Sequence, residues 1–513
     1  MNRLVVVSNR VPEPGAGTQA GGLAVAIGAL LQKQGGLWFG WSGRVSGGAA
    51  EKPVEIAHAG ELDHATLDLT PQEHQGYYNR FSNGVLWPLL HTLPELMMYN
   101  RRDAQVYGEV NARFAESLVP LLRPNDLIWI HDYHLLPLPA LLRARGVHNP
   151  IGFFLHIPFA APDVLASAPD LPGMIKGMLA ADLIGFQTAN DLENFVAAAR
   201  DMAGALPGER GWMQIGGRKM RVGVFPVEID AQAFARSAAL AWRAPPAERL
   251  RRSLGPHVLM LGIDRLDPTK GLLHRLAGLR RLFEKYPEWQ RRATLLQIAA
   301  ISRGDVPSYR ALRRELDREA GNLNSALGDP DWVPLRLVAK AGPREVLAGY
   351  MRQARVGVVT PLRDGMNLVA KEYVAAQNPD DPGVLVLSRF AGAARQLSAA
   401  VLVNPYDADE VADALHVALR MELADRQARW QGMWQAIEHT TSLGWGLGFL
   451  EALVRAAALP GRGVPAEAAG GLMGGWRGKG DRVRSEIEAD PCAAAGAPGG
   501  AQSGFGPSAF RPH

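Results

Sequence analysis

The chain has 513 residues, of which 47% are hydrophobic and 21% are charged, as is typical of a folded, soluble protein of two or three domains. Its 55 Lys and Arg residues are nearly balanced by 51 Asp and Glu, so the net charge of +4 excludes the overall basic character of a nucleic-acid-binding protein. A local basic cleft stays possible. No apolar run approaches the length needed to span a bilayer, so we expect no membrane partner.

The two features that report on the compartment both favour the cytoplasm. The apolar run at 1–8 is too short for a signal peptide, lacks a cleavage region, and is better interpreted as a first buried strand. The single cysteine, Cys492, cannot form an intramolecular disulfide, which is expected in a reducing compartment.

Short apolar runs alternate with helical patterns through most of the chain, and they fall into two series. Runs of this kind without polar alternation are typical of parallel strands that are covered on both faces. The first series of predicted strands lies at 4–7, 127–130, 151–155, 183–186 and 222–225. The second lies at 258–261, 294–298, 335–338, 356–359 and 384–387.

The two series predict an α/β protein with two doubly wound, Rossmann-like domains that face each other across a cleft. We place the first domain at 1–240 and the second at 241–440, because a polar, proline-containing stretch separates the series near 240–255. Residues 441–459 are expected to form a helix that packs back on the first domain. The segment 460–513 is rich in Gly, Ala and Pro and is expected to be a disordered tail.

The segment 360–372 follows a predicted strand and leads into a helix. Asp364 and Gly365 lie in the turn, and Glu372 lies about two turns into the helix. Glycine can adopt backbone angles that other residues cannot, and the unpaired N–H groups at a helix start favour anionic oxygens. The two carboxylates could bind sugar or ribose hydroxyls. The alternative is an ordinary capped turn between a strand and a helix.

A second candidate lies near the N-terminus, where Arg10 follows the first strand and Gly21 and Gly22 open a helix. The glycines would let the backbone approach a phosphate closely, and Arg10 could bind another phosphate. The spacing is not the G-x-G-x-x-G of dinucleotide-binding proteins, so a simple tight turn is an equal alternative.

Histidines follow two strands of the first series. His131, Asp132 and His134 come after one strand, and His156 comes after the next. These residue types could ligate a metal, but the H-E-x-x-H spacing is absent, and we expect no metal there. Asp132 is better suited to accept hydrogen bonds from sugar hydroxyls. A purely structural histidine is the alternative for His156.

Cations and aromatic residues complete the set of candidates. Arg265 and Lys270 lie between a strand and a helix start, where they could neutralise a diphosphate leaving group, and Arg303 follows the next strand. Tyr78 and Trp87 lie in a segment that mixes aromatic and polar groups, and sugar rings stack well on such faces. An exposed charged loop and packed surface aromatics are the alternatives.

Together these segments closely resemble the trehalose-6-phosphate synthases, a retaining glycosyltransferase family with the two-domain GT-B architecture. The resemblance runs from residue 1 to about residue 455. It is carried by long motifs in the same order, at 37–43, 126–137, 151–158 and 360–377.

The resemblance implies a role for each candidate on the donor side. It implies that Gly22 approaches the nucleotide diphosphate, that Arg265 and Lys270 clamp it, and that Glu372 binds the ribose. Asp364 would hold the donor glucose together with the backbone of the residues that follow it, and His156 would contact the same sugar. The residues in that backbone stretch are Gly365, Met366, Asn367, Leu368 and Val369.

On the acceptor side, the resemblance implies that Asp132 faces the acceptor sugar. It implies that glucose 6-phosphate, chiefly its phosphate, is held by Arg10, Tyr78, Trp87 and Arg303.

The resemblance also implies the reaction, which is transfer of glucose from a nucleotide diphosphate to glucose 6-phosphate with retention, giving trehalose 6-phosphate. UDP-glucose is the family's common donor, with ADP or GDP forms as alternatives. No metal or other cofactor is implied, and homo-oligomers, often tetramers, are common. No D-x-D-x-T motif follows residue 460, so a separate trehalose-6-phosphate phosphatase is expected.

Two other functions stay open at this stage. Related enzymes use glycerol 3-phosphate as acceptor and form glucosylglycerol phosphate. A catalytically silent sugar-phosphate sensor on the same scaffold would be expected to lack the clamp or donor residues, and all of these are present.

The chain departs from the family pattern at two places. Asp264 stands where Glu is usual, and Pro268 and Thr269 replace Tyr-Ser, a change that could alter loop closure. The segment 159–162 reads Phe-Ala-Ala-Pro instead of Phe-Pro-x-Pro, which could change packing beside the donor.

Overall fold

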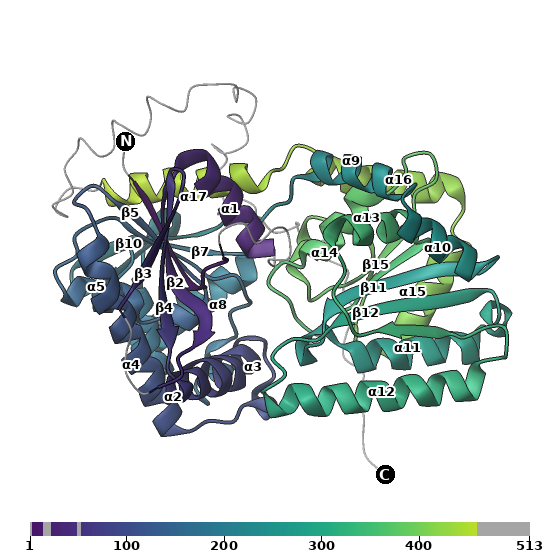
Figure 1. Cartoon of the computed structure of the whole chain (residues 1–513), viewed down its shortest axis with the longest axis horizontal. Helices are drawn as coiled ribbons and strands as arrows, with labels where there is room; N and C mark the ends of the chain where they lie inside the picture. The colour runs from purple at the N-terminus through teal and green to yellow at the C-terminus, as the bar shows by residue number, and fades with distance from the viewer. Residues whose placement is uncertain (1–2, 14–21, 49–52, 459–513) are drawn as a thin grey trace, which may run out of the picture.

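A computed structural model describes residues 3–13, 22–48 and 53–458, and it contains two largely parallel sheets side by side, each covered by helices on both faces (Figure 1). We call the part around the first sheet the first lobe and the part around the second sheet the second lobe. The prediction of an α/β protein with two doubly wound sheets is confirmed.

The first sheet has the strand order β3-β4-β2-β1-β5-β6-β7-β10-β9-β8. Its centre from β4 to β10 is parallel, and antiparallel hairpins close both edges. The strands are β1 (Leu4–Arg10), β2 (Gly36–Val45), β3 (Glu55–Ala59), β4 (Leu62–Leu69), β5 (Leu127–His131), β6 (Ile151–Phe154), β7 (Leu183–Phe186), β8 (Leu206–Pro207), β9 (Trp212–Ile215) and β10 (Arg218–Val224).

The second sheet is parallel throughout, with the order β13-β12-β11-β14-β15-β16. Its strands are β11 (Val258–Arg265), β12 (Ala293–Ala300), β13 (Leu335–Val338), β14 (Val356–Val359), β15 (Val384–Ser388) and β16 (Val401–Val403). All ten predicted runs are strands, with ends that differ by a few residues.

The helices of the first lobe pack in two layers around its sheet. One apolar core joins the sheet to the helices between β4 and β10, and a second core joins its other face to α1 and α17. The main elements are α1 (Gly22–Gln34), the π-helix η1 (His74–Leu86), α3 (Trp87–Leu90), α4 (Arg101–Leu118), η4 (Tyr133–Leu135), α5 (Leu138–Ala144), α6 (Pro162–Leu165), α7 (Leu171–Met178) and α8 (Ala189–Ala203).

In the second lobe, α9, α13, α14 and α16 pack on one face of the sheet, and α11, α12 and α15 pack on the other. These elements are α9 (Ala231–Ala241), α10 (Pro245–Leu254), η6 (Pro268–Lys270), α11 (Leu272–Lys285), α12 (Pro307–Leu327), α13 (Arg344–Gln353), α14 (Leu368–Ala376), α15 (Ala408–Arg420) and α16 (Leu423–Ile437).

The helix α17 (Ser442–Ala457) follows the second lobe in the chain but lies along the first sheet (Figure 1, yellow). Phe449 stacks on Trp129 of β5 with ring centroids 4.7 Å apart. Gly152 of β6 and Gly185 of β7 lie beneath the Phe449 ring, and a Cβ atom on either would come within 2.7 Å of it. The close approach of α17 to the sheet therefore depends on these two glycines.

A buried ion pair fixes the place where the chain passes from the first lobe to the second. The Lys371 side chain of α14 is fully buried, and its Nζ donates to the Val227 carbonyl at 2.9 Å and to Glu228 Oε2 at 2.6 Å. Gln396 donates to the other oxygen of Glu228 at 2.8 Å. The crossing is thus tied to α14, the helix that follows the segment at 360–367.

We predict that Lys371→Met lowers the free energy of unfolding by roughly 3–5 kcal/mol, because it leaves the Glu228 carboxylate buried without its cation. The double variant Lys371→Met/Glu228→Gln should recover most of that loss, since no unpaired charge remains. Urea unfolding measures both. A single variant within about 1 kcal/mol of the wild type would contradict this account of the crossing.

Candidate active site

The predicted site residues come from the carboxyl ends of strands in both sheets. Asp132 and His156 follow β5 and β6, Arg265 ends β11, and Arg303 and Asp364 follow β12 and β14. The lobes touch at this edge, where Arg303 Nη2 donates to Tyr133 Oη at 3.0 Å. Gly365 lies so close to His156 that a Cβ atom would come within 2.2 Å of the His156 carbonyl oxygen.

An arginine and an aromatic ring from different lobes form the centre of the predicted acceptor side. The Arg303 guanidinium lies 3.9 Å from the centroid of the Trp87 ring, and the Arg265 guanidinium lies 5.5 Å from it. Tyr78 is stacked on His134, with ring centroids 5.9 Å apart and planes inclined by 13°. The structure thus brings the two predicted cations to one indole ring.

Two predicted cations keep their charged groups available. The side chains of Arg10 and Arg265 are exposed, and neither guanidinium has a hydrogen bond or ion pair with the part of the chain that the structure describes. Arg10 ends β1, with its guanidinium against Gly43. Both side chains could therefore bind an external anion without breaking a bond to a described residue.

On the donor side, Lys270 and Asp364 form an ion pair, which joins two residues whose predicted roles were separate. Asn367 Nδ2 also donates to Asp364 Oδ2 at 3.0 Å. Burial alone would raise the pKa of Asp364, but the charge and hydrogen bond of Lys270 outweigh it, and the pKa is lowered. Asp364 is therefore an anion at neutral pH.

The segment after Asp364, which is predicted to bind the donor sugar through its backbone, runs into α14. Met366 is buried, and its carbonyl accepts from the Ala393 amide at 2.7 Å. Asn367 has a φ of 74° and caps α14 by accepting from the Ala370 amide at 3.2 Å. Leu368 and Val369 open α14, where peptide N–H groups lack intrahelical partners.

Glu372, the predicted ribose ligand, is paired with a residue that the sequence did not single out. Arg344 of α13 donates to Glu372 Oε1 through Nη2 at 2.7 Å and through Nε at 3.1 Å. Burial raises the pKa of Glu372 despite this neighbour. Nothing in the spacing of residues around Arg344 marks it, because the pairing partner lies on another helix.

Asp132 has a strained backbone. Its φ of 77° and ψ of 169° fall in a region that is essentially restricted to glycine, and such strain is typical of functional sites. Its Oδ1 accepts from the His156 amide at 3.2 Å. Burial raises the pKa of Asp132 to about 6, while peptide hydrogen bonds, Arg303 and Arg265 oppose that rise.

His156 is a neutral side chain bound to a second histidine. Its Nε2 lies 3.0 Å from Nδ1 of His131, and burial lowers the pKa of His156 to about 3. One ring donates and the other accepts, so the accepting ring must be neutral, and burial also lowers the pKa of His131 well below its usual value. Among the described residues, no group of three or more His, Cys, Asp and Glu is arranged to hold a metal ion.

Sequence reasoning missed a group of buried partners beneath these side chains. Asp267 is fully buried and binds Trp87, Thr269, Tyr309 and Arg303. Asp267 lies between Arg265 and Lys270 in the sequence, and this position was the signal that could have identified it as a site residue. The partners in the first lobe and on α12 could not be identified from spacing.

The departures from the family pattern have local structural explanations. Asp264 points into the second lobe and binds the fully buried Arg275, so it serves the core. Pro268 is the first residue of η6, where a missing N–H costs nothing. In the segment 159–162, the Phe159 amide donates to Asp191 Oδ1 at 3.0 Å, and its ring packs against Phe195.

Two sequence predictions concern residues of which the structure says little or nothing. Gly22 is the first residue of α1, and Gly21 lies outside the described residues. The predicted tail at 460–513 also lies outside them.

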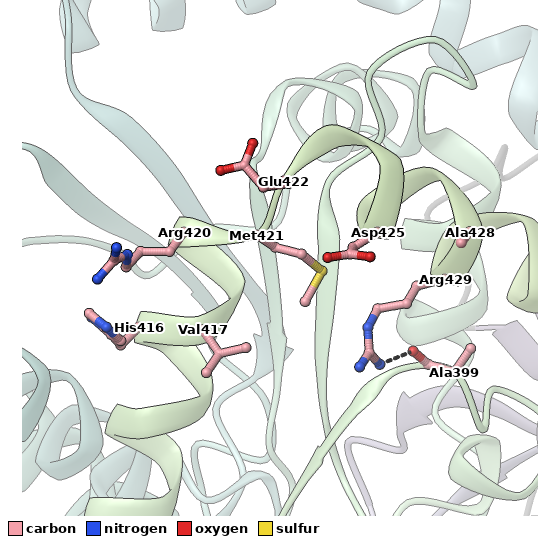
Figure 2. A pocket seen from close by; sticks show the side chains of 9 residues that line it. All are labelled: Ala399, His416, Val417, Arg420, Met421, Glu422, Asp425, Ala428 and Arg429. Carbon is pink, nitrogen blue, oxygen red and sulfur yellow. Dashed lines mark hydrogen bonds between the residues drawn. The ribbon is translucent and has the colours of Figure 1, made fainter.

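A hollow away from the strand ends is lined by apolar and charged side chains of the second lobe. Figure 2 shows it between the end of α15 and the start of α16, with Val417, Met421 and Arg429 among its lining residues. Because α15 begins beside the carboxyl end of β16, its last turn lies at the opposite edge of the sheet. This hollow is therefore separate from the candidate site.

The fold, with two facing doubly wound lobes, is that of a GT-B glycosyltransferase. The model of Glycosyltransferase family 20 matches residues 5–455, and the chain belongs to this family.

Relatives of known structure or curated name cover nearly the whole of that match. A trehalose-6-phosphate synthase of Sinorhizobium fredii is 47% identical over 448 residues, which are 86% of this chain and 96% of the relative. A UDP-forming alpha,alpha-trehalose-phosphate synthase of Burkholderia xenovorans, solved with glucose-6-phosphate, aligns with a TM-score of 0.84 and 42% identity over 88% of this chain and 100% of that one. The E. coli protein bound with UDP-2-fluoro glucose aligns with a TM-score of 0.83 and 42% identity, over 88% of this chain and 99% of that one.

Within the part of the chain that the structure describes, no helix combines the length and the apolar character needed to cross a membrane.

The titration of Asp132 leads to a prediction about stability. Because burial raises the pKa of Asp132 from 3.8 to about 6, the folded state binds this proton more tightly than the unfolded state. The contribution of Asp132 to stability is therefore greatest below its unfolded pKa and declines as the pH rises through about 6. Asp132→Asn removes this titration, so the Tm of the variant minus that of the wild type should increase between about pH 4 and pH 7.

Thermal unfolding at a series of pH values measures this difference. The exposed Asp163→Asn is the matched control and should show a much smaller change. A difference for Asp132→Asn that stays constant with pH would contradict the assignment.

Proposed function

We propose that the protein transfers glucose from UDP-glucose to glucose 6-phosphate with retention of the anomeric configuration, forming trehalose 6-phosphate and UDP. The observation that carries this proposal is the meeting of two groups of cations at one junction. Arg303 on Trp87 offers a phosphate site for the acceptor, and Arg265 and Lys270 offer a diphosphate site beside it. Membership of Glycosyltransferase family 20 and relatives with glucose-6-phosphate and a UDP-glucose analogue support it.

The chemistry follows from where charge develops. As the bond between the anomeric carbon and the diphosphate oxygen breaks, negative charge grows on the UDP leaving group. Arg265, Lys270 and the N-terminus of α1 stabilise this charge, and stabilisation of developing charge is usually the largest catalytic contribution. The acceptor's anomeric hydroxyl attacks on the same face and gives its proton to the departing phosphate oxygen.

The carboxylates then have binding roles and none acts as a nucleophile. Asp132, ionised above about pH 6, accepts from hydroxyls of the acceptor sugar, and Asp364 accepts from the donor glucose. Neutral His156 can contact the donor without adding positive charge beside the developing oxocarbenium carbon. This front-face course differs from that of retaining hydrolases, which form a covalent intermediate on a carboxylate.

The donor and the acceptor are identified by direct assay. The purified chain is incubated without added metal with UDP-, ADP- or GDP-glucose and with glucose 6-phosphate or glycerol 3-phosphate. The product is identified by mass and by the coupling constants of its anomeric protons. We expect α,α-trehalose phosphate from UDP-glucose and glucose 6-phosphate. Turnover confined to glycerol 3-phosphate would overturn the acceptor assignment, and absence of turnover with every pair would favour a sugar-phosphate sensor.

Several finer features belong to the same proposal. We infer a cytoplasmic enzyme of trehalose synthesis that contributes to osmoprotection and works as a homo-oligomer, a homotetramer by family resemblance. Because Arg265 and Lys270 supply the positive charge, the reaction requires no resident metal. A separate trehalose-6-phosphate phosphatase would hydrolyse the product.

We predict that Arg265→Ala lowers kcat by roughly a hundredfold or more, because it removes a fixed positive charge from the leaving group. Arg265 is exposed and its guanidinium bonds to no described residue, so the Tm should change little. Steady-state kinetics with both substrates tests this. Arg291→Ala, which removes an exposed arginine from the opposite edge of the sheet, is the control and should leave kcat unchanged. Near-normal turnover in Arg265→Ala would remove the clamp assignment.

A further inference from the structure

The side chain of Asp267 is fully buried at the junction between the lobes, so it cannot itself touch a substrate. It lies two residues after Arg265 and three before Lys270, in the loop between β11 and η6. Its two carboxylate oxygens bind different sets of neighbours.

Oδ1 joins the first lobe to the loop that carries Lys270. It accepts from Trp87 Nε1 at 3.2 Å, from the Thr269 amide at 3.0 Å and from Thr269 Oγ1 at 2.9 Å. Trp87 opens α3 in the first lobe, whereas Thr269 is the direct neighbour of Lys270. This one oxygen therefore fixes the Trp87 ring on the acceptor side relative to the loop of Lys270 on the donor side.

Oδ2 fixes the guanidinium that lies on the same ring. It accepts from Tyr309 Oη at 2.9 Å and faces Arg303 Nη1 at 3.4 Å. Arg303 Nη2 extends onward to Tyr133 in the first lobe. A single carboxylate thus sets the positions of both Trp87 and Arg303.

The charge of this group is as important as its shape. Burial would raise the pKa of Asp267, but the charges of Arg303, Arg265 and Lys270 hold it well below the usual range. Asparagine would keep the size of the side chain. It could accept from Trp87 and Thr269, but its amide group would face the donors of Arg303.

We propose that Asp267 is a positioning residue that couples the acceptor-phosphate side to the donor-diphosphate side, so that binding of one substrate favours binding of the other. This inference rests on the proposed function. Its physical basis is that Trp87, Arg303 and the loop of Lys270 can reach their bound positions together only while one group holds all three.

A simple counter-ion role makes the opposite prediction. A buried negative charge that only offset the three cations would weaken phosphate binding, and its removal would lower the KM for glucose 6-phosphate with kcat unchanged. Loss of a positioning residue lowers kcat and raises that KM.

The test compares Asp267→Asn with the wild type, both as full chains. Calorimetry gives the Kd of glucose 6-phosphate with and without saturating UDP, and kinetics gives kcat and each KM. We expect saturating UDP to lower the Kd of glucose 6-phosphate by about tenfold or more in the wild type. In Asp267→Asn, we expect UDP to lower that Kd by less than about threefold. We expect kcat/KM for glucose 6-phosphate to fall by roughly a hundredfold.

Two further variants separate positioning from stability. Asp182→Asn removes a buried carboxylate that binds Arg143 and Arg218 in the first lobe, and it should keep the coupling whatever its Tm. Tyr309→Phe removes only the hydroxyl that donates to Oδ2, and it should reduce the coupling if Asp267→Asn folds poorly.

Three outcomes would each overturn the proposal. The first is unchanged coupling in folded Asp267→Asn, and the second is a lower KM for glucose 6-phosphate at constant kcat in that variant. The third is an equal loss of coupling in Asp182→Asn. The wild type alone decides the proposed function, through transfer between the two substrates. If the wild type transfers nothing, the effect of UDP on the Kd of inorganic phosphate in the same proteins still decides whether Asp267 links the two sides.

Discussion

The junction between the lobes depends on one constraint, which is that every charge buried there must have a partner. Removing an ion from water is costly unless an opposite charge or several hydrogen bonds replace its hydration. The pair of Lys270 with Asp364 and the contacts of Asp267 with Arg303 meet this requirement. The same constraint applies at the chain crossing, where Lys371 is paired with Glu228. Two lobes with few covalent connections are thereby held in one arrangement.

The histidines at this junction show the complementary solution, in which a buried group stays neutral. Burial lowers the pKa of His156 to about 3 and that of His91 to about 4, so neither adds to the local positive charge at neutral pH. The fixed positive charge therefore comes from arginine and lysine side chains, whose exposure differs. Arg265 is exposed and unpaired among the described residues, and such a group can respond to an anion without first losing a partner.

The sequence predicted those parts of the fold that depend on short-range patterns. Buried parallel strands are continuous apolar runs, and all ten runs that were predicted are strands. The strand β2 was missed although it is buried and apolar, because its residues 37–43 were interpreted only as a motif. Most of the other missed strands have weaker patterns. The strand β4 mixes Asp63 and His64 with its apolar residues, and β16 is only three residues long. The edge strands β8 and β9 belong to an antiparallel hairpin, which lacks the continuous apolar signal.

Within the site, the sequence singled out side chains that stand in loops after strands, but not the residues that hold them in place. Arg265, Lys270 and Asp364 stand in recognisable loops after strands. The roles of Asp267 and Arg344 arise from partners that are distant in the chain, since Trp87 lies 180 positions before Asp267. The backbone strain at Asp132 was also beyond prediction, because a φ of 77° is disfavoured for aspartate and is imposed by the surrounding structure.

The placement of α17 has a consequence for how the chain is made. The first sheet is complete once residue 224 has been synthesised, but the helix that covers Gly152, Gly185 and Trp129 is formed from Ser442–Ala457. A nascent chain on the ribosome therefore carries an uncovered apolar face throughout translation of the second lobe. The first lobe therefore reaches its final packing only after the second has emerged.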